Sequence, residues 1–165
     1  MPHVSAMNAV FLESLYPVLL LAHLGTTFFL VGAMVHNFWC VVGYTKGRFG
    51  RRKLEKRYVK WIFWSYVAAY GIGALVYPAY KAYISYPGFR LENPWAKGLF
   101  EAKEHWAVIG LLMAGGYFHL RRNFDPSKDR EKLALYVPLC FLLNAVVWYV
   151  LVAGCWLVVM KGSWS

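Results

Sequence analysis

The stretch EHWAVIGLLMAGGYFH, residues 104–119, has a histidine near each end and almost only apolar side chains between them. His105 and His119 are fourteen residues apart. At about 100° per residue, they return to within roughly 40° of the same helix face. The rise between them is about 21 Å, against a hydrocarbon core of about 30 Å. The stretch therefore predicts a membrane-spanning helix that holds one imidazole toward each surface.

The composition of the whole chain agrees with a membrane protein. Of its 165 residues, 59% are hydrophobic and only 16% are charged, unlike those of an ordinary soluble domain. Each spanning helix needs about 20 apolar residues, so the length suits about four helices and leaves little for a separate catalytic domain. We expect an all-α, four-helix transmembrane bundle that forms a single domain, with spans at about residues 16–44, 59–80, 99–120 and 133–160.

The basic residues predict how this bundle is oriented. They cluster in segments 45–60 and 121–132, each flanked by apolar runs. Cytoplasmic loops of membrane proteins carry the excess of lysine and arginine, so both segments are expected inside the cell. The N-terminus, the aromatic loop 81–99 and the C-terminus then lie outside, in a multi-pass protein of the inner (cytoplasmic) membrane. Topology explains the net charge of +10, so we expect membrane lipid and not nucleic acid as a partner.

The cysteines exclude several kinds of site. Cys40, Cys140 and Cys155 all lie in apolar stretches, and the sequence has no CxxC or CxxCH motif. Covalent c-type haem attachment, a zinc site and a disulfide framework are therefore not expected. The first twenty residues contain no lysine or arginine, so we expect no cleaved signal peptide.

A second pair of histidines lies in the first expected span. The first and third spans both run from outside to inside, so His23 and His105 are expected toward the outer surface. His36 and His119 are expected toward the inner surface. Two neutral imidazoles from facing helices, at each of two levels, are what two bis-histidine b-type haems require. The four histidines are therefore the expected iron ligands.

Four further residues fit such haem sites. Gly116 lies on the helix face that joins the two histidines of residues 104–119, where it would leave room for a flat macrocycle. Haem propionates need cationic partners near the membrane surfaces. Arg90 is a candidate partner on the outer side, with Lys97 and several tyrosines as alternatives. Arg121 and Arg122 are candidates on the inner side, with Lys60 as an alternative.

With His23 and His36 on one helix and His105 and His119 on another, the chain resembles the membrane-embedded dihaem b-type cytochromes. This is a four-helix, bis-histidine class, and the resemblance rests on spacing and topology over roughly a quarter of the chain. It implies two haem b groups and electron transfer across the membrane, commonly between a quinol and a redox partner. The chain would then be an electron-transfer subunit of a larger redox complex of the oxidoreductase class, with a quinone or other redox subunits as partners.

The two pairs of histidines are not equivalent. His23 and His36 are thirteen residues apart, which on an ideal helix turns them about 140° from each other. His36 and His119 also differ in expected depth by roughly 9 Å. The inner haem is therefore less well supported than the outer one.

Two other classes of function stay open. In a non-redox structural or assembly subunit, the histidines would be polar contacts between helices. In a copper- or proton-handling protein, they would line a path through the bundle together with Met113. A second likeness, around residues 22–24 and 32–34, is to small haem-binding or copper-related four-helix membrane proteins.

Overall fold

A computed structural model describes residues 13–81 and 94–162 of the chain. In this part the protein consists of one short 3-10 turn and four long α-helices. The all-α, four-helix prediction is confirmed. The elements are η1 (Glu13–Leu15), α1 (Tyr16–Thr45), α2 (Arg52–Tyr80), α3 (Pro94–Arg122) and α4 (Arg130–Gly162).

Three helices begin earlier than the apolar runs that predicted them, α4 only slightly, at Arg130 instead of near residue 133. α2 begins at Arg52 instead of near residue 59, and α3 begins at Pro94 instead of near residue 99. Lysine, arginine and glutamate are good helix formers, so a helix can continue through charged turns beyond its apolar part. Proline suits the first turn of α3, because an N–H group at that position has no partner within the helix. The predicted spans therefore measured only the apolar part of each helix.

Three of the helices, α1, α2 and α4, are long and apolar enough to cross a membrane. They indicate a multi-pass membrane protein. α3 has 29 residues, as many as α2, but its composition does not mark it as a span. That α3 also crosses the membrane stays a prediction. Its first half carries four charged side chains, Lys97, Glu101, Lys103 and Glu104.

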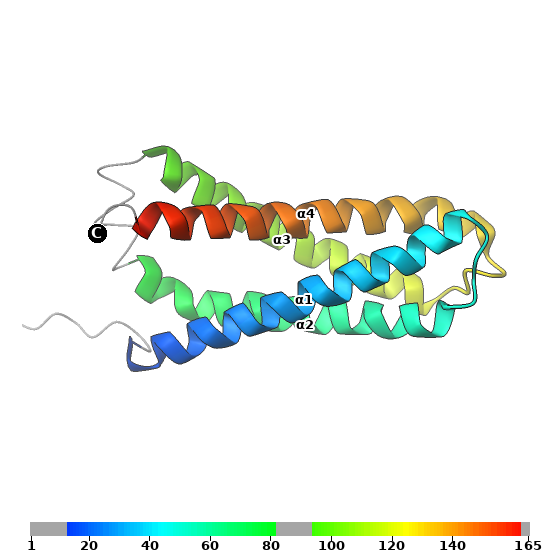
Figure 1. Ribbon diagram of the computed structural model, residues 1–165, viewed down its shortest axis with the longest axis horizontal. Coiled ribbons are helices and arrows are strands. Elements are labelled where there is room, and N and C mark those ends of the chain that lie inside the picture. Colours follow the sequence, from blue (N-terminus) through cyan, green and yellow to red (C-terminus); the bar gives the residue numbers. More distant parts are fainter. Residues whose placement is uncertain (1–12, 82–93, 163–165) are drawn as a thin grey trace, which may run out of the picture.

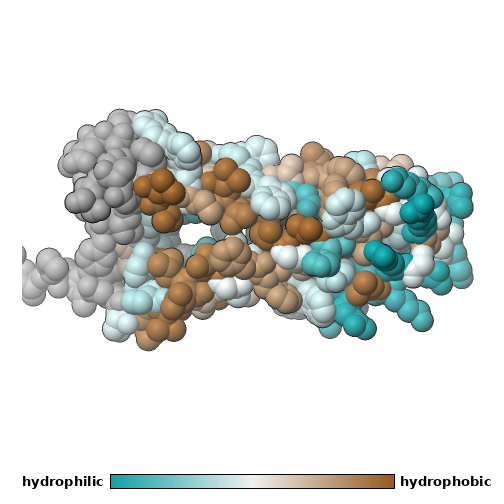
Figure 2. Space-filling view, in the orientation of Figure 1, coloured by the Kyte–Doolittle hydropathy of each residue, from teal (hydrophilic) through white to brown (hydrophobic). Residues whose placement is uncertain are grey.

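The helices form a bundle in which α1 and α3 are diagonal to each other. α1 packs against α2 and α4, and α3 packs against the same two helices. Figure 1 shows connections 46–51 and 123–129 together at one end, while α1 begins and α4 ends at the other. We call these the basic end and the opposite end, because hydrophilic residues gather at the first (Figure 2). The two helices that hold the histidines are therefore not direct neighbours.

Most of the core lies in the half of the bundle nearer the basic end. Its buried side chains include Met34, Val41, Ile62, Tyr117 and Tyr136. A much smaller cluster, built on two buried residues, lies near the opposite end. Toward that end α1 and α2 diverge from α3 and α4 (Figure 1), and Figure 2 shows an opening between the two pairs. The bundle is therefore close-packed at the basic end and loosely packed at the other.

The outer surface of the bundle is rich in large apolar side chains. Leu21, Leu112 and Val158 are each about 70% exposed, at 69%, 72% and 71%. Soluble proteins rarely leave continuous apolar patches of this kind in water, whereas a spanning helix presents them to lipid tails. The surface therefore agrees with the composition in indicating a membrane environment.

Candidate functional site

His23, on α1, is turned toward α2. Its ring nitrogen Nδ1 lies 2.9 Å from the carbonyl oxygen of Ala69, and the side chain is half-buried. Gly73, one turn further along α2, leaves space for the ring, because a Cβ there would lie 3.2 Å from Cε1 of the imidazole. His23 is thus held against a neighbouring helix by a hydrogen bond and a close backbone approach.

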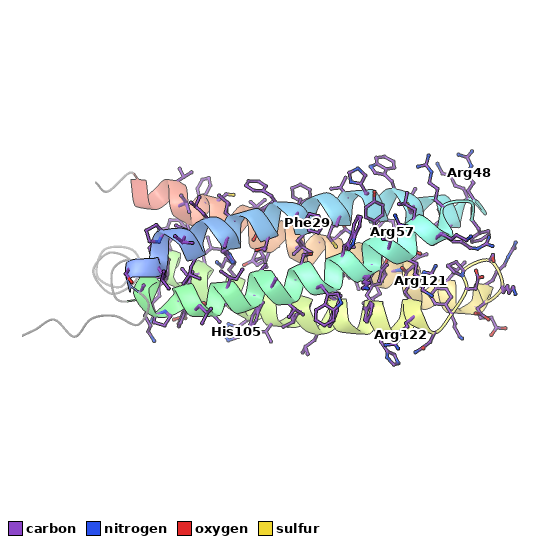
Figure 3. The ribbon with its side chains drawn as sticks, turned by 90° about the horizontal axis from the view of Figure 1, so that it is seen from below. Phe29, Arg48, Arg57, His105, Arg121 and Arg122 are labelled. Atoms are coloured by element: carbon purple, nitrogen blue, oxygen red, sulfur yellow. The ribbon has the colours of Figure 1, made fainter. Side chains whose placement is uncertain are left out.

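His36 and His105 are exposed, and each is hydrogen-bonded to its own helix. In His36, Nδ1 lies 2.7 Å from the carbonyl oxygen of Gly32, and the ring stacks on Tyr58 with centroids 5.5 Å apart. In His105, Nδ1 lies 2.7 Å from the carbonyl oxygen of Glu101. Figure 3 shows His105 at the outer edge of the bundle. These two imidazoles therefore face the surroundings of the bundle.

The three histidines His23, His36 and His105 share one pattern. A carbonyl oxygen can only accept a hydrogen bond, so Nδ1 of each ring must carry the proton and donate it. In a neutral imidazole this leaves Nε2 as an unprotonated nitrogen, able to bind a metal. Histidines that ligate metals usually have their other nitrogen fixed in this way. His119 differs, because its Nε2 is the atom in contact with Nδ2 of Asn123, at 3.1 Å.

The structure does not bring the predicted pairs face to face. His23 contacts α2 and His105 lies on the outside of α3, while α1 and α3 are diagonal. His36 stacks on Tyr58 of α2, and His119 is exposed beside Asn123 on its own helix. The tautomers of three rings fit haem ligation, but among residues 13–81 and 94–162 no two of these rings face each other across one iron site. Nor does the described part contain three or more His, Cys, Asp or Glu side chains grouped to hold a metal ion.

The other predicted haem contacts are scattered. Gly116 is exposed, and a Cβ added to it would meet no atom of the described residues within 4 Å. Arg90 lies outside the described residues. Arg122 is exposed at the basic end, whereas Arg121 is only 4% exposed and turned into the bundle. Of the two arginines predicted to meet propionates on the inner side, only Arg122 has a guanidinium at the surface.

Arg121 belongs instead to a buried polar cluster that the sequence did not predict. Its Nε donates to Oε2 of Glu55 at 2.6 Å, and Glu55 is completely buried. Nη1 donates to the carbonyl oxygen of Phe124 at 2.8 Å, and Nη2 donates to that of Arg52 at 3.0 Å. All three nitrogens of the guanidinium are therefore occupied by acceptors of this chain.

The carboxylate of Glu55 connects all four helices. Tyr44 of α1 donates its hydroxyl proton to Oε2 at 3.1 Å, and Tyr136 of α4 donates to Oε1. Glu55 itself lies on α2, and Arg121 lies on α3. Gly47, with φ of 71°, completes the turn that reverses the chain after α1 and lets α2 begin beside Tyr44. One buried acid thus holds a donor from each of the other three helices.

The polar cluster continues toward the middle of the bundle. Tyr117 stacks on Tyr136 with ring centroids 4.5 Å apart, and Asn37 donates from Nδ2 to the hydroxyl of Tyr117 at 2.7 Å. The same amide nitrogen lies 3.6 Å from Sγ of Cys140. The amide oxygen of Asn37 is buried and has no hydrogen-bond partner among the described residues. A row of polar groups therefore runs inward from the basic end through an otherwise apolar core.

The sequence gives little sign of this cluster. Glu55 is the only acid in segment 45–60, among many lysines and arginines, so it could be read as a surface residue of a basic loop. Arg121 directly follows the third apolar run, so the sequence suggests a charged residue that ends a span at the membrane surface. Nothing local in the sequence marks their pairing, because they are 66 positions apart.

Comparisons with known proteins leave the geometry as the only guide to function. No family model matches the chain, and neither the curated proteins nor the solved structures that were searched contain a match.

Proposed function

We propose that the chain is a membrane-embedded electron-transfer subunit that binds haem b through Nε2 of His23, His36 and His105, with the second iron ligand supplied by another chain. The observation that supports this is the shared hydrogen-bond pattern of His23, His36 and His105. Each donates Nδ1–H to a carbonyl oxygen and keeps Nε2 for a metal.

The proposal places the second ligand on another chain because two of these rings face outward. His36 and His105 are exposed on a surface that is otherwise rich in apolar side chains. An imidazole directed at lipid is costly, and such residues usually find a partner. A haem between two chains would be ligated from both sides, and its apolar edge would be buried against neighbouring helices.

The histidines also lie at two levels of the bundle, as transmembrane electron transfer requires. His23 and His36 are thirteen residues apart on α1, which is about 20 Å along the helix. The haem would supply the one-electron chemistry, and the protein would supply ligation and burial. We further propose that the basic end is cytoplasmic and both termini are outside, in the inner membrane, with a quinone or redox subunit as partner.

Titration of haem tests the proposal, on protein purified together with the chains that associate with it in the membrane, because one iron ligand is proposed to come from another chain. Wild-type protein in mild detergent should shift the haem absorption band and give a reduced-minus-oxidised spectrum of b type. His36→Ala and His105→Ala should each lower the amount of bound haem, because each removes an outward Nε2. His119→Ala is the matched control, since its Nε2 contacts Asn123, and it should bind as wild type does. Haem binding that is unchanged in all three variants would refute the proposed ligands.

A second candidate is a non-redox structural or assembly subunit. It is favoured by the cluster around Glu55, which connects four helices with its charges satisfied inside the chain. In such a protein, the Nδ1 hydrogen bonds of the histidines would only satisfy polar N–H groups in lipid. The same titration separates the two candidates, because a structural subunit would show no saturable shift of the haem band.

A further inference from the structure

A groove with a volume of about 530 Å³ runs between α2 and α3 at the basic end. Its apolar part includes Val59, which is buried, and Trp64 and Phe118. Phe118 stacks on Phe63 with ring centroids 4.9 Å apart, and this contact joins the two helices beside the groove. The complete lining is Lys56, Val59, Lys60, Trp64, Phe118, Arg121 and Arg122.

The rim of the groove carries three cationic side chains that form no ion pair with any described residue. Lys56 and Lys60 are one helical turn apart on α2, and Arg122 stands on α3 across the groove. All three are exposed, and no carboxylate of residues 13–81 or 94–162 lies within 4.0 Å of them. Glu55, the acid nearest to them in the sequence, forms its ion pair with Arg121 instead. Like charges that line one groove repel one another, and a bound anion would offset that repulsion.

Arg121 lines the groove but differs from these three residues. Its guanidinium nitrogens already donate to Glu55 and to two carbonyl oxygens. Figure 3 shows Arg121 and Arg122 next to each other near the basic end, with Arg122 at the outer edge. Arg121 therefore fixes this part of α3, and Lys56, Lys60 and Arg122 are the groups that face an incoming ligand.

We propose that this groove binds an anionic phospholipid from the membrane leaflet at the basic end. The phosphate would lie between Lys56, Lys60 and Arg122, and an acyl chain would lie along the apolar side chains below. Basic pockets between membrane helices are known to take acidic lipid headgroups for this electrostatic reason. The inference does not depend on haem, because none of the histidines lines the groove.

The chemistry of the groove distinguishes a lipid from other occupants. A soluble phosphate ion would satisfy the cationic rim but leave the exposed Trp64 and the partly exposed Phe118 uncovered. A neutral apolar molecule would cover those side chains but leave the three charges without an anion. Only an amphipathic anion satisfies both parts, and the groove is within the roughly 300–1,000 Å³ of ordinary ligand pockets.

Lipid binding by the purified, full-length protein tests this proposal. The probes are cardiolipin, phosphatidylcholine and inorganic phosphate, each added to protein in mild detergent, with native mass spectrometry and the melting temperature as readouts. Cardiolipin should bind and raise the melting temperature, and the other two should do neither. Equal effects of phosphate would identify a soluble anion site, and equal binding of phosphatidylcholine would identify an uncharged apolar site; either result overturns the proposal.

Two double variants test the residues. Lys60→Gln with Arg122→Gln removes two cations from the rim and should weaken cardiolipin binding roughly 30-fold, since each cation near an anionic lipid contributes about a fivefold factor. Lys46→Gln with Arg48→Gln removes the same charge from the exposed connection at the same end, outside the groove. This control should bind within about twofold of wild type. Equal losses in both variants would show that only the general charge of this end attracts lipid.

Discussion

Nε of Arg121 on α3 lies 2.6 Å from Oε2 of Glu55 on α2, and both side chains are buried. Removing one member of such a pair leaves an uncompensated charge in a medium of low dielectric constant, which usually costs about 3–5 kcal/mol. We therefore expect Arg121→Gln and Glu55→Gln each to lower the free energy of unfolding strongly. Unfolding of the purified protein in a denaturing detergent titration would measure the loss.

The same chain offers a surface pair as a control. Arg52 and Asp125 are 3.9 Å apart, and their side chains are 46% and 39% exposed. Because water screens such a pair, Arg52→Gln should change the free energy of unfolding by no more than about 1 kcal/mol. A double variant of Glu55→Gln with Arg121→Gln should be less destabilised than the sum of the two single variants, since neither charge is then left alone. Strict additivity would show that the two side chains do not stabilise each other.

The tyrosine hydroxyls that donate to Glu55 supply a second prediction. Tyr44→Phe and Tyr136→Phe each remove one donor to the carboxylate and keep the ring. A hydrogen bond to a charged group contributes about 1.5–3 kcal/mol, so each variant should be less stable by an amount in this range. The same unfolding titration measures it. Tyr58→Phe is the control, because Tyr58 contributes its ring to the stack with His36, and it should unfold as wild type does.

The helices could be predicted from the sequence because their signals are local. Apolar runs of sufficient length, separated by two basic segments and one aromatic segment, predict four helices and their order regardless of what packs against them. The beginning of α2 at Arg52 was missed because an apolar run marks only the part of a helix that lies in the hydrocarbon core. The helix itself can continue through charged turns on either side.

The relation between the histidines is not a local property. Spacing along α3 gives the angle between His105 and His119, but it does not give the rotation of α3 about its own axis. Packing of α2 and α4 on both sides of α3 sets that rotation, and it leaves His105 at the outer edge. The burial of Glu55 has the same origin, because it depends on Tyr44, Tyr136 and Arg121, which come from three other helices.

The connection between α3 and α4 predicts a response to acid. Asp125 accepts hydrogen bonds at Oδ1 from the backbone N–H of Ser127, at 3.0 Å, and from its hydroxyl, at 2.7 Å. These bonds lower the pKa of Asp125 below its ordinary value of 3.8. A carboxyl group with a lowered pKa stabilises the folded state above its ordinary pKa, and that contribution is lost as the pH falls through the lowered value.

Ser127→Ala removes the hydroxyl and keeps the backbone N–H. The pKa of Asp125 should therefore rise part of the way toward 3.8, and the loss of stability in acid should begin at a higher pH than in wild type. NMR titration of the carboxyl carbon of Asp125, compared in the two proteins below about pH 5, measures the shift. An unchanged titration curve would show that the backbone bond alone holds the carboxylate.

Two glycines of α3 supply a matched pair for the last prediction. A Cβ at Gly110 would lie 2.9 Å from Cγ1 of Val146 on α4 and would collide with the hydroxyl of Tyr66 on α2. Gly110→Ala should therefore separate α3 from both neighbours and reduce the free energy of unfolding by about 1–3 kcal/mol, as overpacking of a core usually does. A Cβ at Gly116 would meet no described atom of a neighbouring element within 4 Å. Gly116→Ala should therefore raise the free energy of unfolding by the roughly 0.5–1 kcal/mol by which alanine favours a helix over glycine. If the proposed haem lies against Gly116 between two chains, Gly116→Ala should also bind less haem. The isolated variant should still unfold at a higher denaturant concentration than wild type. A gain of stability with unchanged haem binding would show that Gly116 is not part of the haem site.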